Sequence, residues 1–432
     1  MTENISLHDH LIEHCNKSME IAISSERHPL WERSCSELSD IDFVRLGLLR
    51  CISAVDSGRH FLDKTETVFG EHLPISTYFN SIKSSRRANM LEAVEKKSYL
   101  LHCRTLASHG IDYLKQFPEL DQYKVEAADG HFVEHACHTE KGSNDKVYAA
   151  GFIYSLNLRN GLLKPLCHVT NGTVRNQEIP ALRSCIENRN NKIGGAEKCL
   201  YIYDKAATDY SWWNRQKNHE NYMISVLKEN SAADFVESIA FDNSDDVNIG
   251  VERYSIYING GIKFSVIEYR DPETKKYHRF VTTLPTSINP GTIALLYFKR
   301  WTIEKAFNNS KSDLKEKKAW SSNFNALKNQ MRLTSMTYNL IRVCEEISKI
   351  QNPELIHPSD KKYTKALEKR DQIAKKRDCF VNPLFFQARI TRICSSTIRK
   401  IQDGIMTGKS LAWLMESLAD QLVLRLKIIV EH

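Results

Sequence analysis

The pattern of apolar and polar positions changes along the chain, and its first part is helical. Residues 1–105 carry apolar side chains at helical spacing, most clearly in DFVRLGLLRCISAV and ANMLEAVEKKSYLLHC. Between these two runs lies HLPISTYFNSIKSSRRANM, which has a proline near its start and two arginines near its end. That stretch fits the second helix of a helix-turn-helix, and it fits a further helix of a plain bundle equally well.

Short apolar and β-branched runs replace the helical spacing after residue 120. Five of them are bounded by polar turns and are expected to form strands: YKVEAADG, VYAAGFIYSLNL, LLKPLCHVT, EKCLYIYD and NYMISVLK. Helices are expected at about 177–189 and 209–219, on either side of the fourth run. This order predicts an α/β fold with a mixed sheet flanked by helices.

A small β module follows, at about residues 230–290. Its centre, RYSIYINGGIKFSVIEYRD, has two alternating runs around Asn259-Gly260-Gly261, which is a strong signal for a hairpin. Beyond Pro290 the spacing is helical again. The last helix, SLAWLMESLADQLVLRLKIIV, is the most apolar and is expected in the core or at an oligomer contact.

Length and composition narrow the class of protein. A chain of 432 residues suggests two or three domains, and 41% hydrophobic with 26% charged residues is typical of a soluble globular protein. No apolar run approaches the roughly 18 residues that span a bilayer. The polar start MTENISLHDH has no apolar signal segment, so we expect a cytoplasmic protein. Eleven cysteines without a CxxC pair favour reduced thiols.

The positive charge of the chain is concentrated near its end. The formal net charge is +7, yet residues 361–400 alone hold seven Lys and five Arg against three acidic residues, which gives 12 − 3 = +9. A basic block of this kind favours a polyanionic partner such as nucleic acid. A solvated helix face explains the segment equally well.

Two aspartates end predicted strands. Asp129 closes YKVEAAD and precedes Gly130, which is expected to let the backbone turn sharply, and Asp204 closes CLYIYD. Adjacent strands lie roughly 4.8 Å apart, so two such carboxylates could flank one Mg²⁺ ion, which prefers oxygen ligands. Each aspartate taken alone is equally well explained as a turn residue.

A third carboxylate lies in the helical stretch YFKRWTIEKAFNNSK, residues 297–311. At about 100° per residue, four polar side chains share one edge of this helix: Tyr297, Arg300, Glu304 and Lys311. A separate apolar stripe is expected to hold the helix to the core: Leu296, Ile303, Phe307 and Leu314. The polar edge is therefore expected to serve a function.

A competing metal site is conceivable in DGHFVEHACH. His131, His135, Cys137 and His138 are soft-metal ligands within eight residues. No second cluster at a matching spacing exists in the chain, so a polar stretch beside the active site is the alternative interpretation.

The spacing of Tyr297, Arg300, Glu304 and Lys311 resembles the YREK signature of DDE transposases of bacterial insertion sequences, in the insertion-sequence-four group. The RWxIE core of that signature is present. Asp129 in ADG and Asp204 in YIYDKAATDY look like the first and second aspartates of the family. The similarity covers about residues 120–345, and VTTLP lies where the family returns from an inserted β domain.

The resemblance implies a ribonuclease-H-like fold and a DNA transposase that cleaves transposon ends and transfers strands into target DNA. Asp129, Asp204 and Glu304 would then be the catalytic residues and would bind two Mg²⁺ ions, with Mn²⁺ as a substitute. Five residues are expected to contact DNA: Tyr297, Arg300, Lys311, Lys299 and Trp301.

The resemblance also gives a domain plan and a set of partners. We expect a helical DNA-binding region at 1–105, a catalytic domain at 106–345 that contains the β insertion at 230–290, and a basic helical region at 346–432 for phosphate contacts or dimerisation. Terminal inverted repeats, target DNA and a second copy of the chain in a synaptic complex are the expected partners, in a bacterial nucleoid. A metal-dependent nuclease without strand transfer and an inactive DNA-binding regulator are the alternatives.

One departure concerns the inserted β domain. Relatives that form a hairpin intermediate use a tryptophan there to stack a flipped base, and this chain has no tryptophan between 230 and 290. Four aromatic residues could substitute, although packing explains them equally well: Tyr254, Tyr257, Phe264 and Tyr269.

Overall fold

The computed structural model describes most of the chain between residues 37 and 351. The described residues are 37–52, 57–69, 73–134, 148–170, 178–192, 197–204, 208–227, 231–301 without 273, then 303, 304, 306, 307, 314 and 318–351. The basic block at 361–400 and the apolar last helix lie outside them.

One sheet of nine strands lies at the centre of the fold, in the order β3-β2-β1-β4-β5-β9-β8-β7-β6. The strands are β1 Tyr123–Glu134, β2 Tyr148–Asn157, β3 Leu163–Val169, β4 Lys198–Ile202, β5 Asn221–Val226, β6 Asp234–Ser238, β7 Val251–Asn259, β8 Ile262–Arg270 and β9 Tyr277–Thr282. β1 is antiparallel to β2 and parallel to β4, and β4 is parallel to β5. The predicted fold class, a mixed α/β sheet of the ribonuclease-H-like kind, is confirmed.

The β insertion continues this sheet. Its last strand, β9, pairs antiparallel with β5, with Ile224 opposite Thr282. The hairpin of β7 and β8 turns at Gly260 and Gly261, whose φ angles are +53° and +81°. Two consecutive positive φ angles define the type I′ turn, which suits glycine and matches the twist of the flanking strands. The predicted hairpin is therefore confirmed, and the four strands β6–β9 extend the sheet formed by β1–β5.

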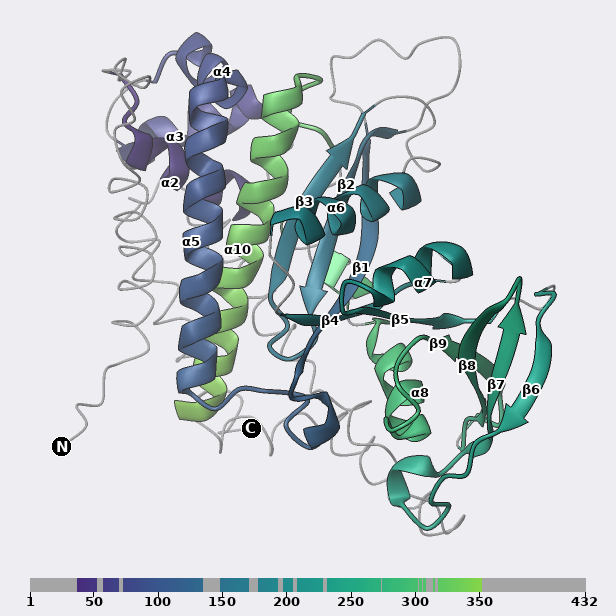
Figure 1. Cartoon of the computed structure of the whole chain (residues 1–432). Coiled ribbons are helices and arrows are strands. Elements are labelled where there is room, and N and C mark those ends of the chain that lie inside the picture. Colours follow the sequence, from purple (N-terminus) through teal and green to yellow (C-terminus); the bar gives the residue numbers. More distant parts are fainter. Residues whose placement is uncertain are drawn as a thin grey trace.

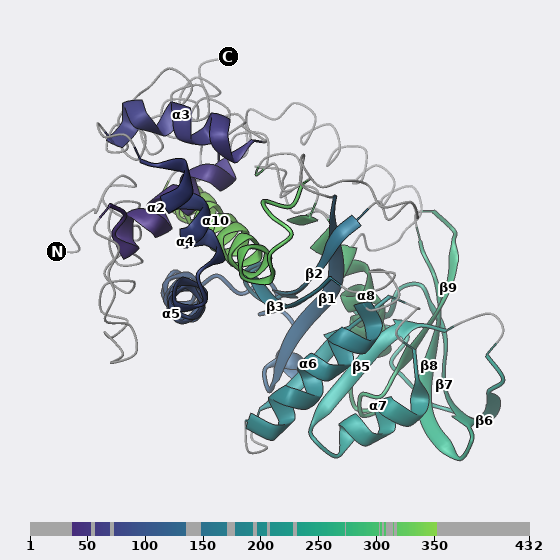
Figure 2. The same cartoon turned by 90° about the horizontal axis from the view of Figure 1, so that it is seen from above.

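Helices cover both faces of the sheet. α6 (Glu178–Lys192) and α7 (Tyr210–Lys217) lie on one face, and α8 (Pro290–Lys299) lies on the other (Figure 1, Figure 2). Leu182 of α6 and Trp213 of α7 share one apolar core with the sheet, while Leu296 of α8 belongs to a second core on the opposite face. The helices predicted at 177–189 and 209–219 are thus present.

A helical region packs beside the sheet. It contains α2 (Asp40–Ile52), α3 (Gly58–Phe69), α4 (Ile75–Lys83) and α5 (Ser85–Ser108), and α10 (Phe324–Gln351) runs alongside α5 (Figure 1). Asn339 of α10 both donates to and accepts from the backbone of Leu163 at 2.7 Å, and Asn329 donates to the carbonyl of Ile82 at 2.9 Å. α10 therefore joins the helical region to the edge strand β3.

Two arginines at the end of the helix-turn-helix candidate form contacts within the helical region. Arg86 donates to both carboxylate oxygens of Asp40, at 2.8 and 2.6 Å, and Arg87 is 2% exposed and donates to the carbonyl of Leu38. Both arginines therefore stabilise the packing of α5 on α2. A DNA-binding role for residues 1–105, and the domain plan as a whole, stay predictions. No helix among the described residues has the length and apolar character needed to cross a membrane.

Candidate active site

The two predicted aspartates lie on the central pair of parallel strands. β1 and β4 run side by side with Ala127 opposite Ile202. Asp129 follows Ala127 by two residues, and Asp204 follows Ile202 by two residues, so the two aspartates occupy equivalent positions at the same edge of the sheet. Because side chains alternate between the two faces along a strand, both carboxylates are expected on the same face of the sheet. The sheet therefore sets the two aspartates close together.

The expectation that the first strand ends at Asp129 is wrong. β1 runs on to Glu134, because β2 continues to pair with it beyond β4, with Asp129 opposite Tyr154. Gly130 therefore makes no sharp turn, and its φ angle is not among the positive ones. What Gly130 does provide is space, because a Cβ atom there would lie 2.7 Å from Cδ of Glu178.

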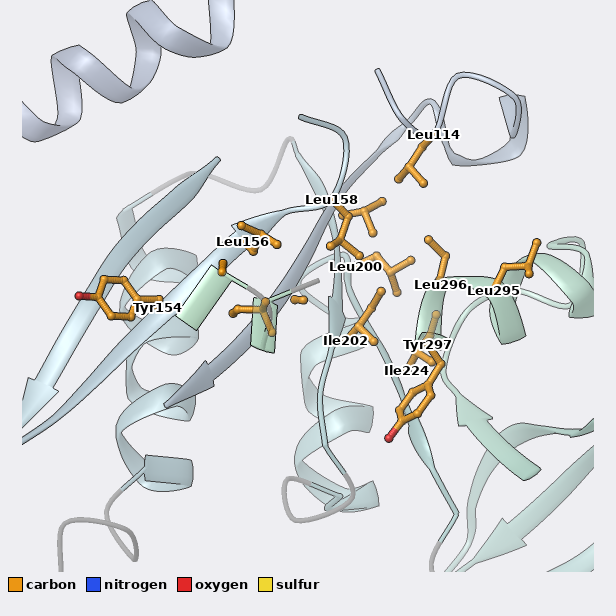
Figure 3. Packing of buried hydrophobic residues seen from close by; sticks show 14 of the residues in the cluster. Leu114, Tyr154, Leu156, Leu158, Leu200, Ile202, Ile224, Leu295, Leu296 and Tyr297 are labelled. Carbon is orange, nitrogen blue, oxygen red and sulfur yellow. The ribbon is translucent and has the colours of Figure 1, made fainter. Parts of the chain in front are cut away.

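The helix that carries the third carboxylate is anchored by apolar side chains. Leu296 and Tyr297 of α8 lie beside the strand residues Leu200, Ile202 and Ile224 in the core between helix and sheet (Figure 3). Beyond α8, the helical turn that carries Glu304 is anchored by side chains that are nearly inaccessible to solvent: Ile303, Ala306 and Phe307. The predicted apolar stripe of four residues is confirmed as buried: Leu296, Ile303, Phe307 and Leu314.

Arg300 bridges two of the predicted carboxylates. It closes α8, and its side chain is 6% exposed. One guanidinium nitrogen lies 2.9 Å from a carboxylate oxygen of Glu304, and another lies 3.8 Å from an oxygen of Asp129. Its carbon lies 5.6 Å from the centre of the Tyr297 ring. The acidic residues of β1 and of the helix after α8 therefore meet at one arginine.

A further carboxylate, Glu178, belongs to the same cluster. The backbone N–H of Gly130 donates to Oδ1 of Asp129 at 2.9 Å and to Oε1 of Glu178 at 3.0 Å. Burial, followed by the neighbouring charge of Asp129, raises the pKa of Glu178 to about 7, and the charge of Asp204 acts in the same direction. Burial also raises the pKa of Asp129, against the opposing effects of the Gly130 N–H and Arg300.

Sequence reasoning missed Glu178. It is the first residue of α6, and acidic residues in the first turn of a helix are common because they complement the helix dipole. Nothing in its spacing from Asp129 or Asp204 marks it as special, so only the three-dimensional packing identifies it.

The predicted DNA contacts fall in different environments. Trp301 is 58% exposed next to Arg300, whereas Tyr297 is buried and its ring packs on Phe280 at 5.0 Å between centroids. Lys299 is 6% exposed and faces away from the cluster, where its Nζ donates to the carbonyl of Tyr113 at 3.3 Å. The structure therefore does not bring Lys299 to the site. Lys311 lies outside the described residues.

The aromatic candidates of the β insertion are core residues. The four are at most 8% exposed: Tyr254, Tyr257, Phe264 and Tyr269. The exposed aromatic side chains of the insertion are instead Phe235, at 48%, and Tyr277, at 42%, within the described residues. Packing therefore accounts for the period-two aromatics.

The donor set suits hard divalent cations. Carboxylate oxygens are the ligands that Mg²⁺ and Mn²⁺ prefer, and Asp129, Glu178, Asp204 and Glu304 supply only such groups. In the described part of the chain, no three acidic, histidine or cysteine side chains already enclose a metal position. Arg300 accounts for this in part, because it bridges Asp129 and Glu304.

The soft-metal alternative finds no support at its one described residue. His131 is 1% exposed and packs against the ring of Phe307, with centroids 5.4 Å apart, and against that of Tyr154. Its ring therefore helps to anchor the helix of Glu304. The other candidates, His135, Cys137 and His138, lie outside the described residues.

Comparison with known proteins agrees with this geometry. Residues 128–340 match the family model described as the transposase DDE domain. Over 194 residues the chain is 27% identical to a protein of Sinorhizobium fredii (strain NBRC 101917 / NGR234) named "Putative transposase y4zB". The aligned part covers 42% of this chain and 52% of that protein, so the chain spans about half the length of the curated relative it matches.

Proposed function

We propose that the chain is a DNA transposase that cleaves the ends of an insertion sequence and joins them to target DNA. The observation that carries the proposal is the meeting of Asp129, Glu304 and Arg300, from β1 and the helix after α8. Asp204 follows two residues after the end of β4, the parallel neighbour of β1. The match of residues 128–340 to the transposase DDE domain supports the same conclusion.

Asp129, Asp204 and Glu304 would hold two divalent cations, Mg²⁺ or Mn²⁺. Bound in this way, the cations supply charge that activates a water or 3′-hydroxyl and stabilises the leaving oxygen in an in-line displacement at phosphorus. The residues themselves contribute fixed positions. Asp129 lies in β1 opposite Tyr154 of β2, two residues beyond the last pair with β4, and Glu304 is held by the buried side chains of its own helix. Preorganised charge of this kind is worth more than flexible charge.

Arg300 and Trp301 would contact the DNA end. The Arg300 guanidinium lies between two catalytic carboxylates, so a phosphate bound there receives its N–H donors beside the cation positions. Trp301 exposes most of its ring next to Arg300, and an exposed aromatic face can stack on an unpaired base. Tyr297 would orient Arg300 from below, because its ring lies beneath the guanidinium. Lys311, later in the chain, would contact a further phosphate of the DNA.

The wider assembly is part of the proposal. The chain would bind terminal inverted repeats through the helical region at its start and through the basic block at 361–400, and it would act as a homodimer in a synaptic complex. Phosphate contacts of this kind make affinity fall steeply with salt.

A nicking assay tests the proposal. Purified protein, Mg²⁺ and the DNA that flanks its gene should give cleavage at the element ends. Glu304→Gln, Asp129→Asn and Asp204→Asn should each abolish cleavage while leaving DNA binding within about twofold of wild type. Wild-type cleavage by any one variant would remove that residue from the catalytic set.

A further inference from the structure

Glu178 is held against Asp129 by a contact that only glycine permits. Both carboxylates accept a hydrogen bond from the N–H of Gly130, at 2.9 and 3.0 Å. A side chain at position 130 would begin 2.7 Å from Cδ of Glu178, well inside van der Waals contact. The carboxylate of α6 therefore reaches the strand that carries Asp129 because Gly130 leaves room for it.

A helix-terminal role does not explain this placement. An acidic residue that only complements a helix dipole is expected to stay near the N–H groups of its own helix. Oε1 of Glu178 instead accepts from Gly130 of β1, 48 residues earlier in the chain. Its carboxylate therefore lies beside Asp129 of the candidate site.

The surroundings of Glu178 are acidic. Asp129 is in hydrogen-bond contact with it, and the charge of Asp204 reaches it as well. Within the described ranges, none of the ion pairs at 4.0 Å or less involves Glu178, whereas Arg300 serves Asp129 and Glu304. Two carboxylates that share one N–H donor repel each other, and a cation bound between them would offset that repulsion.

We propose that Glu178 is a fourth carboxylate of the active site and supplies an oxygen ligand to the divalent cation held by Asp129 and Asp204. The proposal rests on the proposed function, since it concerns the same cations. Asp204 is exposed two residues beyond the end of β4, and Asp129 and Glu178 are already adjacent. Oxygen ligands from β1, β4 and α6 would then surround one cation, and Glu304 would complete the second position.

Iron-directed cleavage of the polypeptide tests the assignment without DNA. Fe²⁺ occupies many Mg²⁺ sites, and with ascorbate and peroxide it generates radicals that cut the backbone near the bound ion. The wild-type, full-length chain should be cut near residues 129, 178 and 204, and excess Mg²⁺ should suppress the cuts. Glu178→Gln should reduce cutting at least tenfold at the same Fe²⁺ concentration.

Glu187→Gln is the matched control. It changes another glutamate of α6 to glutamine, at a side chain that accepts a hydrogen bond from Trp212 at 2.8 Å and faces α7. Its cutting pattern should equal that of wild type. Glu178→Asp, which keeps the charge but shortens the reach, should fall between wild type and Glu178→Gln.

The outcomes separate the two proposals. Wild-type cutting by Glu178→Gln, with loss of cutting in Asp129→Asn, would overturn the role of Glu178 and leave the proposed function standing. Absence of site-directed cutting in the wild-type chain would count against the proposed function itself. A Glu178→Gln protein that fails to fold would also overturn the assignment, because glutamine keeps the size of the side chain and the acceptor for Gly130.

Discussion

Arg300 donates to the carboxylate of Glu304 across one helical turn, with 2.9 Å between nitrogen and oxygen, and the same guanidinium reaches Asp129 at 3.8 Å. A cation side chain thus lies where two proposed metal ligands approach each other. Its side chain is 6% exposed and that of Glu304 is 46% exposed. The arginine of the pair is therefore buried, whereas the carboxylate of Glu304 is accessible to solvent.

Arg300→Lys should slow end cleavage by about 10²-fold, which is the usual cost of removing one preorganised electrostatic contact. Lysine keeps the charge, but a single ammonium cannot span two carboxylates or hold a phosphate through two parallel bonds. The rate of nicking at saturating protein measures the effect. A lysine variant that cleaves at the wild-type rate would show that charge alone suffices at this position.

Lys299 and Lys311 should differ in their effect on DNA binding. Lys299 is buried against Tyr113, and burial lowers its pKa to about 8. Lys299→Met should therefore leave the slope of log affinity against log salt unchanged. Lys311→Met should reduce that slope by about one. Titrations of an end-containing duplex at several salt concentrations measure both, and equal slopes for the two variants would contradict the assignment.

Trp301→Ala should weaken binding to DNA with an unpaired end by ~1–3 kcal/mol, the usual worth of one stacked base. The ring is 58% exposed, so the melting temperature of the free protein should hardly change. Phe324→Ala is a matched control, since this aromatic ring is 57% exposed at the start of α10. Equal losses for the two variants would argue against a specific contact at Trp301.

Glu95 of α5 should make stability depend on pH. It is 4% exposed, and burial raises its pKa from 4.5 to about 7, against the opposing charges of Arg332 and Lys164. The folded state therefore binds this proton more tightly than the unfolded chain does. Its contribution is complete below pH 4.5 and is lost as the pH rises through 7, by up to ~3 kcal/mol.

Melting curves of wild type and Glu95→Gln at pH 5 and pH 8 measure this effect. From pH 5 to pH 8 the variant should lose less stability than the wild-type protein does. Glu92 of the same helix is the control, because Lys96, Arg332 and Lys328 outweigh its burial and lower its pKa to about 2. Glu92→Gln should lower stability about equally at both pH values. If Glu95→Gln had the same dependence of stability on pH as the wild-type protein, the proposed role of Glu95 would be contradicted.

Local patterns in the sequence predicted much of the fold. Alternation and turn residues identify the hairpin at Gly260 and Gly261, and helical spacing identifies the buried stripe of Ile303 and Phe307. These features depend on neighbours in the chain, so the residues themselves carry the signal. The continuation of β1 past Asp129 depends on β2, and it could not be read from the strand alone.

The site was only partly predictable for the same reason. Glu304 could be proposed because its helix carries the spacing of a known signature. Asp129 and Asp204 could be proposed because each closes a predicted strand and resembles an aspartate of the same family. Glu178 carries no such spacing, and its place follows from the missing side chain at Gly130. Lys299 shows that closeness in the chain does not place a side chain at the site. It adjoins Arg300 in the chain, but one position along a helix turns a side chain by about 100°, which directs it toward Tyr113.

We propose that this chain joins DNA as well as cutting it. The most direct measurement incubates the full-length protein with Mg²⁺, a labelled donor carrying the DNA that flanks its gene, and a supercoiled target plasmid. The wild-type protein should join the labelled donor covalently to the plasmid, and Asp129→Asn should give no joined product. Nicked donor without joined product would overturn the proposed strand transfer and would identify a nuclease of the same fold.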